Sequence, residues 1–242
     1  MRLLDHLARH PVRAVDLAQP LWPGMPHSPT HPGFASVLTS GHDGPPRDDG
    51  MTGAHETITL GTHVGTHVDA ACHVAVRRAV LVDEPGLRGV DRLDPGEAVT
   101  VEDLARGEAP IGAGDAVLVR TGWAQLWDRP ELYVGTATGV PGLDEAAGAW
   151  LAERGVALVG ADTIALEQIR PETGHRRLPV HRVLLAEAGI NLVEVMDLEA
   201  VAGQREFALV CAPLRILGAT GGPVRPVALL DAPSMTQEMT RR

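Results

Sequence analysis

The sequence contains no lysine, so its basic side chains are all arginine or histidine. This absence excludes Schiff-base chemistry and a lysine general base, which both need an ε-amino group. The two cysteines are too few for a disulfide framework. No apolar run approaches the roughly 20 residues that cross a membrane, and the N-terminus lacks the apolar segment of a secretory signal. We therefore expect a cytoplasmic protein that does not bind membranes.

Positive charge and aromatic side chains are also scarce. Acidic residues outnumber basic ones by 31 to 21, which gives a net charge of −10, and no arginine cluster forms a basic stripe. Nucleic-acid binding is therefore not expected. Aromatic residues make up 3% of the chain, which argues against a pocket built for a large aromatic substrate. The motifs of serine hydrolases, P-loop enzymes and dinucleotide-binding domains are missing, so those classes have no support.

The most informative stretch that is present runs from His63 to His73 and contains three histidines and one aspartate. Histidine and aspartate are ligands that divalent metals accept. In an extended segment residues 63, 65, 67 and 69 share one face, and the β-branched residues between them favour a strand. We therefore predict a strand that presents His63, His67 and Asp69 to a metal. His73 is either a further ligand or, as we favour, a general acid/base.

The segment from Pro20 to Gly50 is rich in proline, glycine, serine and histidine and predicts an irregular arm. Long segments of this kind often form functional lids, although a flexible surface segment is the alternative. Trp22 and His27 are the arm's candidates for substrate binding, with ordinary packing as the other interpretation of Trp22. His31 shares the arm and is a further possible pocket residue.

The second half of the chain predicts alternating helices and strands. Apolar periodicity favours helices over Leu143–Arg154 and Pro179–Ala188, and short apolar runs favour strands over Val156–Val159 and Ile190–Val195. This alternation is typical of an α/β fold with a mixed sheet. A length of 242 residues fits one domain, and we expect a single domain over residues 1–242.

Two residues of this half extend the metal hypothesis. His181 lies at the start of the second helix and Glu194 at the end of the strand that follows. A short connection between helix and strand would bring both to one edge of the sheet. Together they could hold a second ion close to the first, as in two-metal hydrolytic sites.

These residues resemble the pattern of the metal-dependent cyclase superfamily, which includes bacterial kynurenine formamidase and isatin hydrolase. The pattern His-x-Gly-Thr-His-x-Asp-x-Pro-x-His matches from His63 to His73, except that Ala71 occupies the proline position. The segment from His181 to Glu194 resembles the second half of the family's metal site. There Val195 replaces the usual asparagine.

The resemblance implies a swivelling β/β/α domain, with a mixed sheet flanked by helices, that forms a homodimer or homotetramer. It implies one or two zinc or manganese ions, with His63, His67 and Asp69 on the first. Asp69, His181 and Glu194 would serve the second, and His73 would transfer protons.

The function that we expect from this site is hydrolysis of a small formamide, lactam or related cyclic amide. Metal-activated water would attack the carbonyl, with histidine as general acid/base. Two alternatives remain open. The same site could serve a cyclase, dehydratase or lactonase of secondary metabolism, or the chain could be a non-catalytic metal- or ligand-binding protein. The enzyme hypotheses require a small-molecule substrate as partner.

Overall fold

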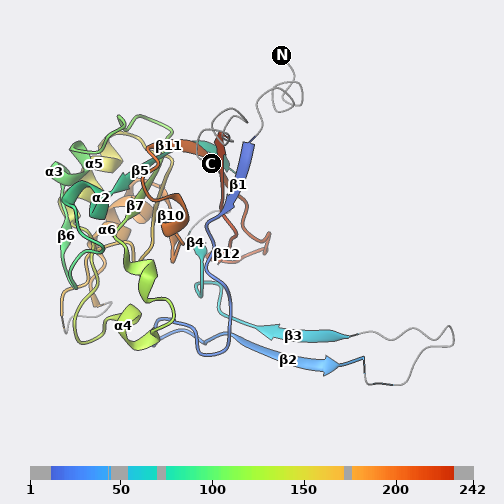
Figure 1. The fold of residues 1–242 in the computed structure, drawn as a ribbon. Coiled ribbons are helices and arrows are strands. Elements are labelled where there is room, and N and C mark those ends of the chain that lie inside the picture. The colour runs from blue at the N-terminus through green and yellow to red at the C-terminus, as the bar shows by residue number, and fades with distance from the viewer. Residues whose placement is uncertain (1–11, 43, 45–53, 70–74, 172–175, 232–242) are drawn as a thin grey trace, which may run out of the picture.

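The computed structural model describes residues 12–42, 44, 54–69, 75–171 and 176–231 (Figure 1). Its strands are β1 (Val12–Asp16), β2 (Ala35–Ser40), β3 (His55–Thr59), β4 (His67–Asp69), β5 (Ala75–Asp83), β6 (Ala98–Val99), β7 (Ala116–Arg120), β8 (Gly142–Leu143), β9 (Leu158–Ala161), β10 (Asn191–Glu194), β11 (Glu206–Cys211), β12 (Gly221–Pro223) and β13 (Val227–Asp231). Its helices are α2 (Glu84–Arg88), α3 (Val101–Ala105), α4 (Pro130–Val134), α5 (Glu145–Glu153) and α6 (Pro179–His181), with a π-helical turn η3 (Arg182–Glu187) and 3-10 turns η1 (Trp123–Leu126) and η4 (Glu199–Val201). Among the described residues, no helix has the length and apolarity that a membrane span requires.

Within the described residues, nine strands form one mixed sheet in the order β1-β13-β11-β5-β7-β9-β10-β4-β12. The four central strands β5, β7, β9 and β10 are parallel to one another. On either side of them β11 and β4 run antiparallel to their neighbours. The expectation of an α/β fold with a mixed sheet is therefore confirmed.

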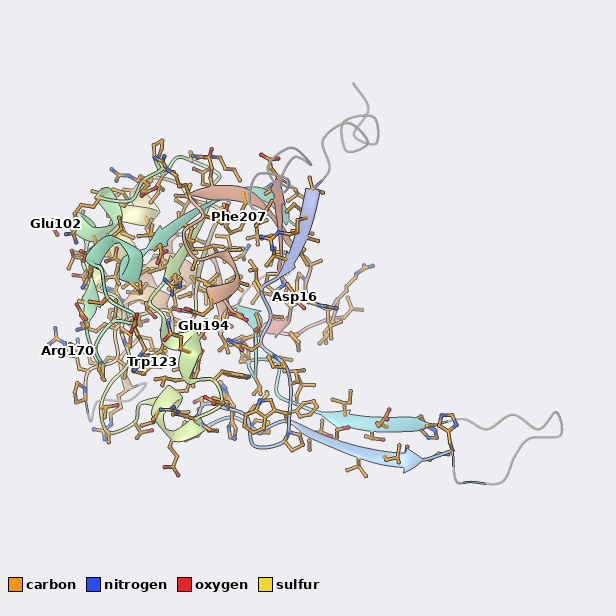
Figure 2. The ribbon with its side chains drawn as sticks, viewed as in Figure 1. Asp16, Glu102, Trp123, Arg170, Glu194 and Phe207 are labelled. Atoms are coloured by element: carbon orange, nitrogen blue, oxygen red, sulfur yellow. The ribbon has the colours of Figure 1, made fainter. Side chains whose placement is uncertain are left out.

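Strands β7, β9 and β10 are buried on both faces, as expected where layers of structure cover a parallel sheet. Every residue of β7 is buried. Ala116 and Leu118 of this strand belong to one apolar cluster, which also contains Phe207 (Figure 2). Val117 and Val119 face a second cluster that packs under α3 and α5. A third cluster forms around Trp123 and Tyr133.

The predicted helices and strands of the second half are present with shifted ends. The first helix begins later than predicted, because Asp144 is its N-cap and accepts a hydrogen bond from the amide of Ala147 (2.7 Å). The second helix runs through α6 and η3 and ends before Gly189, whose φ of +67° suits glycine. The strand that follows, β10, ends at Glu194.

The arm was predicted to be irregular, and this is wrong for part of it. β2 pairs with β3 as an antiparallel hairpin that projects away from the body of the molecule (Figure 1). The side chains of Val37, Leu38 and Ile58 on this hairpin are exposed by 58–61%. Local β-propensity and pairing between the strands form the hairpin, since it lacks a buried face.

The predicted strand from His63 to Asp69 is only partly present. β4 covers His67–Asp69, whereas the residues before it form turns. The cause is Gly65, which has a φ of +70° and packs so closely on Leu21 that a Cβ would lie 2.6 Å from Leu21 Cδ2. A left-handed residue interrupts an extended strand, so the alternation of faces holds for His67 and Asp69 but not for His63.

Candidate metal centre

The centre of the site is the pairing of two short strands. β4 runs antiparallel to β10, and His67 lies directly opposite Glu194 in this register. His67 and Asp69 are two residues apart on β4 and share one face, whereas Val68 between them packs into the sheet's apolar cluster. The strand register therefore places an imidazole between two carboxylates.

His67 is buried, and its ring is oriented by the backbone. Its Nδ1 donates a hydrogen bond to the carbonyl oxygen of Gly65 (2.8 Å). Because a carbonyl only accepts, the proton belongs on Nδ1 and the lone pair on Nε2. Nε2 lies 3.3 Å from Asp69 Oδ1 and 3.5 Å from Glu194 Oε2. The free nitrogen thus faces both carboxylates.

His63 reaches the same place from the turn that precedes β4. Its Nδ1 lies 2.6 Å from Asp69 Oδ1 and its Nε2 lies 3.0 Å from Thr220 Oγ1. Its ring meets that of His67 edge-on, with centroids 5.3 Å apart. Gly221 on β12 leaves space for it, because a Cβ there would lie 2.6 Å from His63 Cε1.

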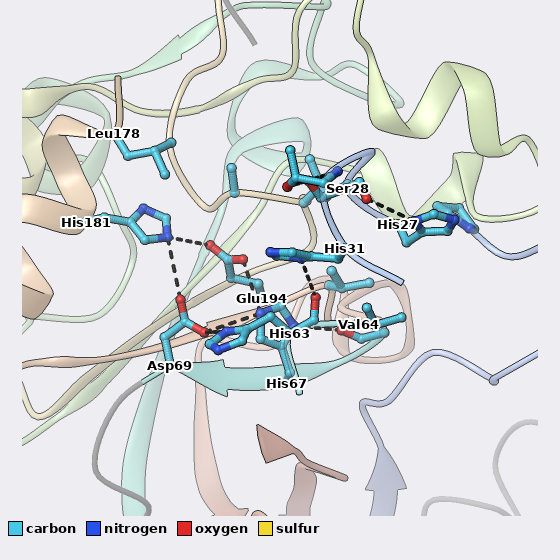
Figure 3. A pocket seen from close by; sticks show the side chains of 16 residues that line it. His27, Ser28, His31, His63, Val64, His67, Asp69, Leu178, His181 and Glu194 are labelled. Carbon is cyan, nitrogen blue, oxygen red and sulfur yellow. Dashed lines mark hydrogen bonds and ion pairs between the residues drawn. The ribbon is translucent and has the colours of Figure 1, made fainter. Parts of the chain in front are cut away.

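His181 approaches from the opposite side, on α6 (Figure 3). Its Nδ1 is 2.7 Å from Glu167 Oε1, and Glu167 also accepts hydrogen bonds from the amides of Val180 and His181. Its Nε2 lies 3.0 Å from Glu194 Oε1 and 3.8 Å from Asp69 Oδ2. The buried Glu167 therefore orients this ring.

Glu167 is a residue that the sequence reasoning missed. It lies between β9 and α6, in a segment without periodic pattern, and it is 1% exposed. Its only signal is an acidic residue in an otherwise apolar run, Ile164-Ala165-Leu166-Glu167. A buried carboxylate without a cationic neighbour in sequence implies a partner elsewhere in the fold.

The carboxylates set the electrostatics of the cluster. Burial alone would lower the pKa of His181, but Glu167 and Glu194 raise it to about 10. Burial likewise opposes a charge on His67, yet Asp69 and Glu194 raise its pKa. Burial would raise the pKa of Asp69, but His67 and His63 hold it below its usual value. The site therefore favours positive charge at the imidazole nitrogens.

The donor set fits a divalent cation. His63, His67 and Asp69 form one group whose ligand atoms lie within 4.8 Å of one another, and Asp69, His181 and Glu194 form a second. Glu194 Oε1 is buried and accepts no hydrogen bond from a described residue, although His181 Nε2 is 3.0 Å away. With Nδ1–H donated to Glu167, two lone pairs face each other there, and a proton or a metal ion must separate them. Nitrogen and carboxylate ligands of this kind suit zinc or manganese.

A cavity of about 390 Å³ opens over the cluster, and all five ligand candidates line it. One wall is apolar and consists of Ile164, Ala165, Leu178 and Val195. Val195 follows Glu194 directly and has a φ of +58°, which is strained for a β-branched residue. The hydroxyl of Thr66 donates to its carbonyl oxygen (2.5 Å) and ties this strained turn to the approach of β4.

The structure places the two substrate-binding candidates of the arm differently. His27 lines the cavity, but its Nδ1 donates to the carbonyl oxygen of Ser28 (2.9 Å) and its ring packs on Gly33. Trp22 does not line this cavity; it packs against the third apolar cluster, which contains Trp123. His73, the predicted general acid/base, lies outside the described residues.

Comparisons with known proteins agree on one family. The model of the Cyclase family, described as "Putative cyclase", matches residues 15–168. Kynurenine formamidase from Bordetella avium is 32% identical over 178 residues, which cover 70% of this chain and 78% of that protein. Kynurenine formamidase from Salinibacter ruber is 31% identical over 189 residues, which cover 73% of this chain and 80% of the relative.

The fold has a similar relative among solved structures. Isatin hydrolase A from Ralstonia solanacearum superimposes with a TM-score of 0.79 at 26% identity, over 95% of this chain and 96% of that one. An isatin hydrolase A from Labrenzia aggregata, bound to benzyl benzoate, gives a TM-score of 0.77 at 25% identity, over 95% and 98% of the two chains. These relatives therefore match nearly the whole fold and not the metal motif alone.

Proposed function

The chain belongs to the Cyclase family, and from this we propose that it is a metal-dependent hydrolase of a non-peptide C–N bond in a small formamide, lactam or related cyclic amide. Its named relatives are formamidases and isatin hydrolases, which supports an amide as the substrate. The metal that we propose is zinc or manganese, as one or two ions.

One observation carries this proposal. Asp69 belongs to both ligand groups, and both groups form the floor of one cavity. A buried carboxylate placed between histidines that come from opposite sides can bridge two cations. A structural metal site would be closed on all sides, whereas this cluster opens onto a space that holds a small molecule. The open cavity thus favours an enzyme over a non-catalytic binding protein.

The chain's residues have distinct parts in the reaction. His63, His67 and Asp69 would hold one ion, and Asp69, His181 and Glu194 another. A bound divalent ion supplies polarisation of the amide carbonyl and activation of water. The carbonyl of Gly65 and the carboxylate of Glu167 keep the lone pairs of His67 and His181 directed at the cluster.

The apolar wall completes the site. Ile164, Leu178 and Val195 exclude water from one side of the substrate, which strengthens electrostatic interactions at the reacting carbonyl. The leaving nitrogen needs a proton, and we propose that His73 donates it, four residues beyond Asp69 in the chain. The replacement His73→Ala should abolish turnover and retain metal; loss of metal instead would identify His73 as a ligand.

The proposal is tested by metal analysis combined with a substrate screen. Purified protein loaded with zinc or manganese is expected to hydrolyse at least one of formanilide, isatin and simple lactams or formamides. In 18O-labelled water the product should gain one solvent oxygen, which a cyclisation or dehydration would not introduce. Stoichiometric metal without hydrolysis of any compound in the screen would contradict the proposed function.

We further propose that the enzyme is a cytoplasmic homodimer or homotetramer. The support is the β2–β3 hairpin, whose Val37, Leu38 and Ile58 are largely exposed. A two-stranded hairpin is marginally stable in water, so a second copy of the chain would stabilise it by covering these residues. Sedimentation velocity at micromolar concentration should give a dimer or larger assembly, and a monomer would contradict this proposal.

A further inference from the structure

His31 lines the cavity, yet no step proposed above uses it. It lies in the arm between Pro29 and Pro32, which restrict the backbone on both sides. Its amide donates to the carbonyl oxygen of Ser28 (3.0 Å), which closes a tight turn. Pro32 in turn packs on Gly61, where a Cβ would lie 3.4 Å from the proline ring. The arm thus fixes His31 against the turn that carries His63.

The ring of His31 is held by His63. Its Nδ1 lies 3.2 Å from the carbonyl oxygen of His63, and the two rings are 5.9 Å apart at a tilt of 40°. Since the carbonyl oxygen can only accept, Nδ1 carries the proton. In the neutral ring Nε2 therefore carries the lone pair and is a hydrogen-bond acceptor.

No described residue provides a hydrogen-bond partner for this Nε2. Figure 3 shows the ring over the cluster, between His181 on one side and the backbone of residues 63 and 64 on the other. The cavity that the ring lines also contains apolar side chains and the acceptor Glu194. The hydroxyls of Ser28 and Thr30 are bonded to each other (3.0 Å). A substrate that enters the cavity can therefore supply the donor for this nitrogen.

We propose that His31 is a substrate-positioning residue whose Nε2 accepts a hydrogen bond from the N–H of the scissile amide. This inference rests on the proposed amide hydrolysis and deepens it, because it selects secondary amides and N–H lactams over N-alkylated amides. In a lactam the N–H lies on the same side of the C–N bond as the carbonyl oxygen, so an oxygen turned toward the metal ligands also turns the N–H toward the cluster, over which His31 lies. An acceptor above the cluster orients the amide and discriminates against a compound that lacks the donor.

The test compares isatin with N-methylisatin in the metal-loaded wild type, in His31→Ala and in His31→Gln. The wild type should favour isatin in kcat/KM by about tenfold beyond the ratio of the uncatalysed hydrolyses, as expected for one neutral hydrogen bond. His31→Ala should lose this preference by slowing isatin alone. His31→Gln retains a carbonyl acceptor and should keep part of the preference. His55→Gln, on the exposed strand β3, is the matched control and should behave as wild type.

A second readout does not depend on turnover. In protein labelled with 15N-histidine, the imidazole signals that disappear in His31→Gln belong to His31. These signals should show a protonated Nδ1 and an unprotonated Nε2. Addition of isatin, but not of N-methylisatin, should shift the Nε2 signal. Metal content measured on each variant separates a substrate effect from loss of the ion.

The outcomes distinguish the two proposals. If the wild type hydrolyses isatin but His31→Ala slows both compounds equally, or leaves their ratio unchanged, the role of His31 is overturned and the hydrolase survives. A protonated Nε2 in the resting enzyme overturns it as well. If the wild type binds isatin with the predicted Nε2 shift but hydrolyses neither compound, the positioning role stands and hydrolysis of this lactam is refuted. If the wild type neither hydrolyses isatin nor shows the shift, the role of His31 is overturned, whereas the proposed hydrolysis fails only if every other compound of the screen is also left intact.

Discussion

The two halves of the metal site are built in different ways. The ligands of the first half lie on β4 and on the turn that precedes it. A backbone carbonyl orients the buried histidine of this half, His67. The second half comes from α6 and the end of β10, and the buried carboxylate of Glu167 orients His181. A carbonyl is fixed by the path of the chain, whereas a carboxylate adds a negative charge. The first half therefore depends on backbone geometry and the second on buried charge.

Asp69 joins the halves, so its replacement should have the largest effect. Asp69→Asn removes the charge that both ligand groups share, and we expect metal to be lost from both. Activity should fall by at least about a thousandfold, equivalent to ~4 kcal/mol of transition-state stabilisation. Metal content by mass spectrometry and kcat/KM measure this. Loss of one ion only, with activity retained, would show that the halves do not share this ligand.

Glu167→Gln tests the second half alone. The glutamine amide would face three N–H donors with one oxygen and no charge, so His181 would lose its orientation. We expect metal affinity of the second site to fall by about 10- to 100-fold, with the first site unchanged. Calorimetric titration of metal-free protein resolves the two steps. Glu145→Gln, at an exposed ion pair with Arg182, is the control and should match wild type.

Gly65→Ala tests the first half. Alanine at a φ of +70° is strained, and its Cβ would clash with Leu21. We expect the free energy of unfolding to fall by about 2 kcal/mol, and the affinity of the first site for metal to decrease. Gly189 has a similar φ of +67°, but a Cβ there would meet nothing within 4 Å. Gly189→Ala should therefore lower the free energy of unfolding by only about 1 kcal/mol. Equal effects in chemical denaturation would show that the contact with Leu21 is unimportant.

A charged network away from the metal site allows the effect of a substitution on fold stability to be measured apart from its effect on metal binding. Asp83 accepts hydrogen bonds from Arg120 (2.6 Å) and the amide of Gly203 (2.9 Å). Burial would raise the pKa of the Asp83 carboxyl, but these partners hold it below its ordinary value. A depressed carboxyl pKa stabilises the fold above the unfolded pKa, and this contribution disappears as the pH falls through the folded pKa.

Asp83→Asn should therefore lower the free energy of unfolding by about 1–2 kcal/mol at pH 7, and the deficit should vanish as the pH falls through the lowered pKa of Asp83. Denaturation at a series of pH values measures the difference. Metal affinity of both halves should stay unchanged at pH 7. A change in metal binding would mean that global stability, and not local orientation, determines the effects seen at Glu167 and Gly65.

The sequence predicted the mixed sheet and the main helices because their signals are local. Apolar periodicity, the cap at Asp144 and the stop at Gly189 act within a few residues of the helices that they end. The grouping of His63, His67 and Asp69 could also be predicted, because residues so near in sequence stay close in almost any backbone conformation. The strand through His63 was wrong because Gly65 reverses the backbone, and a lone glycine in a β-branched run was the sign of it.

Other parts depend on contacts between distant segments. Glu167 is functional only because α6 brings the amide and ring of His181 to its carboxylate. His31 gains its position from the carbonyl of His63, 32 residues away. The β2–β3 hairpin pairs strands across a proline- and glycine-rich stretch that conceals their β-propensity. Such contacts have no periodic signature in the sequence.

The pairing of His67 with Glu194 across β4 and β10 has a consequence for how metal occupancy can be observed. The backbone hydrogen bonds that place these ligands belong to the sheet itself. An ion that tightens the side chains must also slow the local opening of these strands. The exchange of amide hydrogens on β10 with solvent deuterium is then a direct gauge of loading, readable without any substrate.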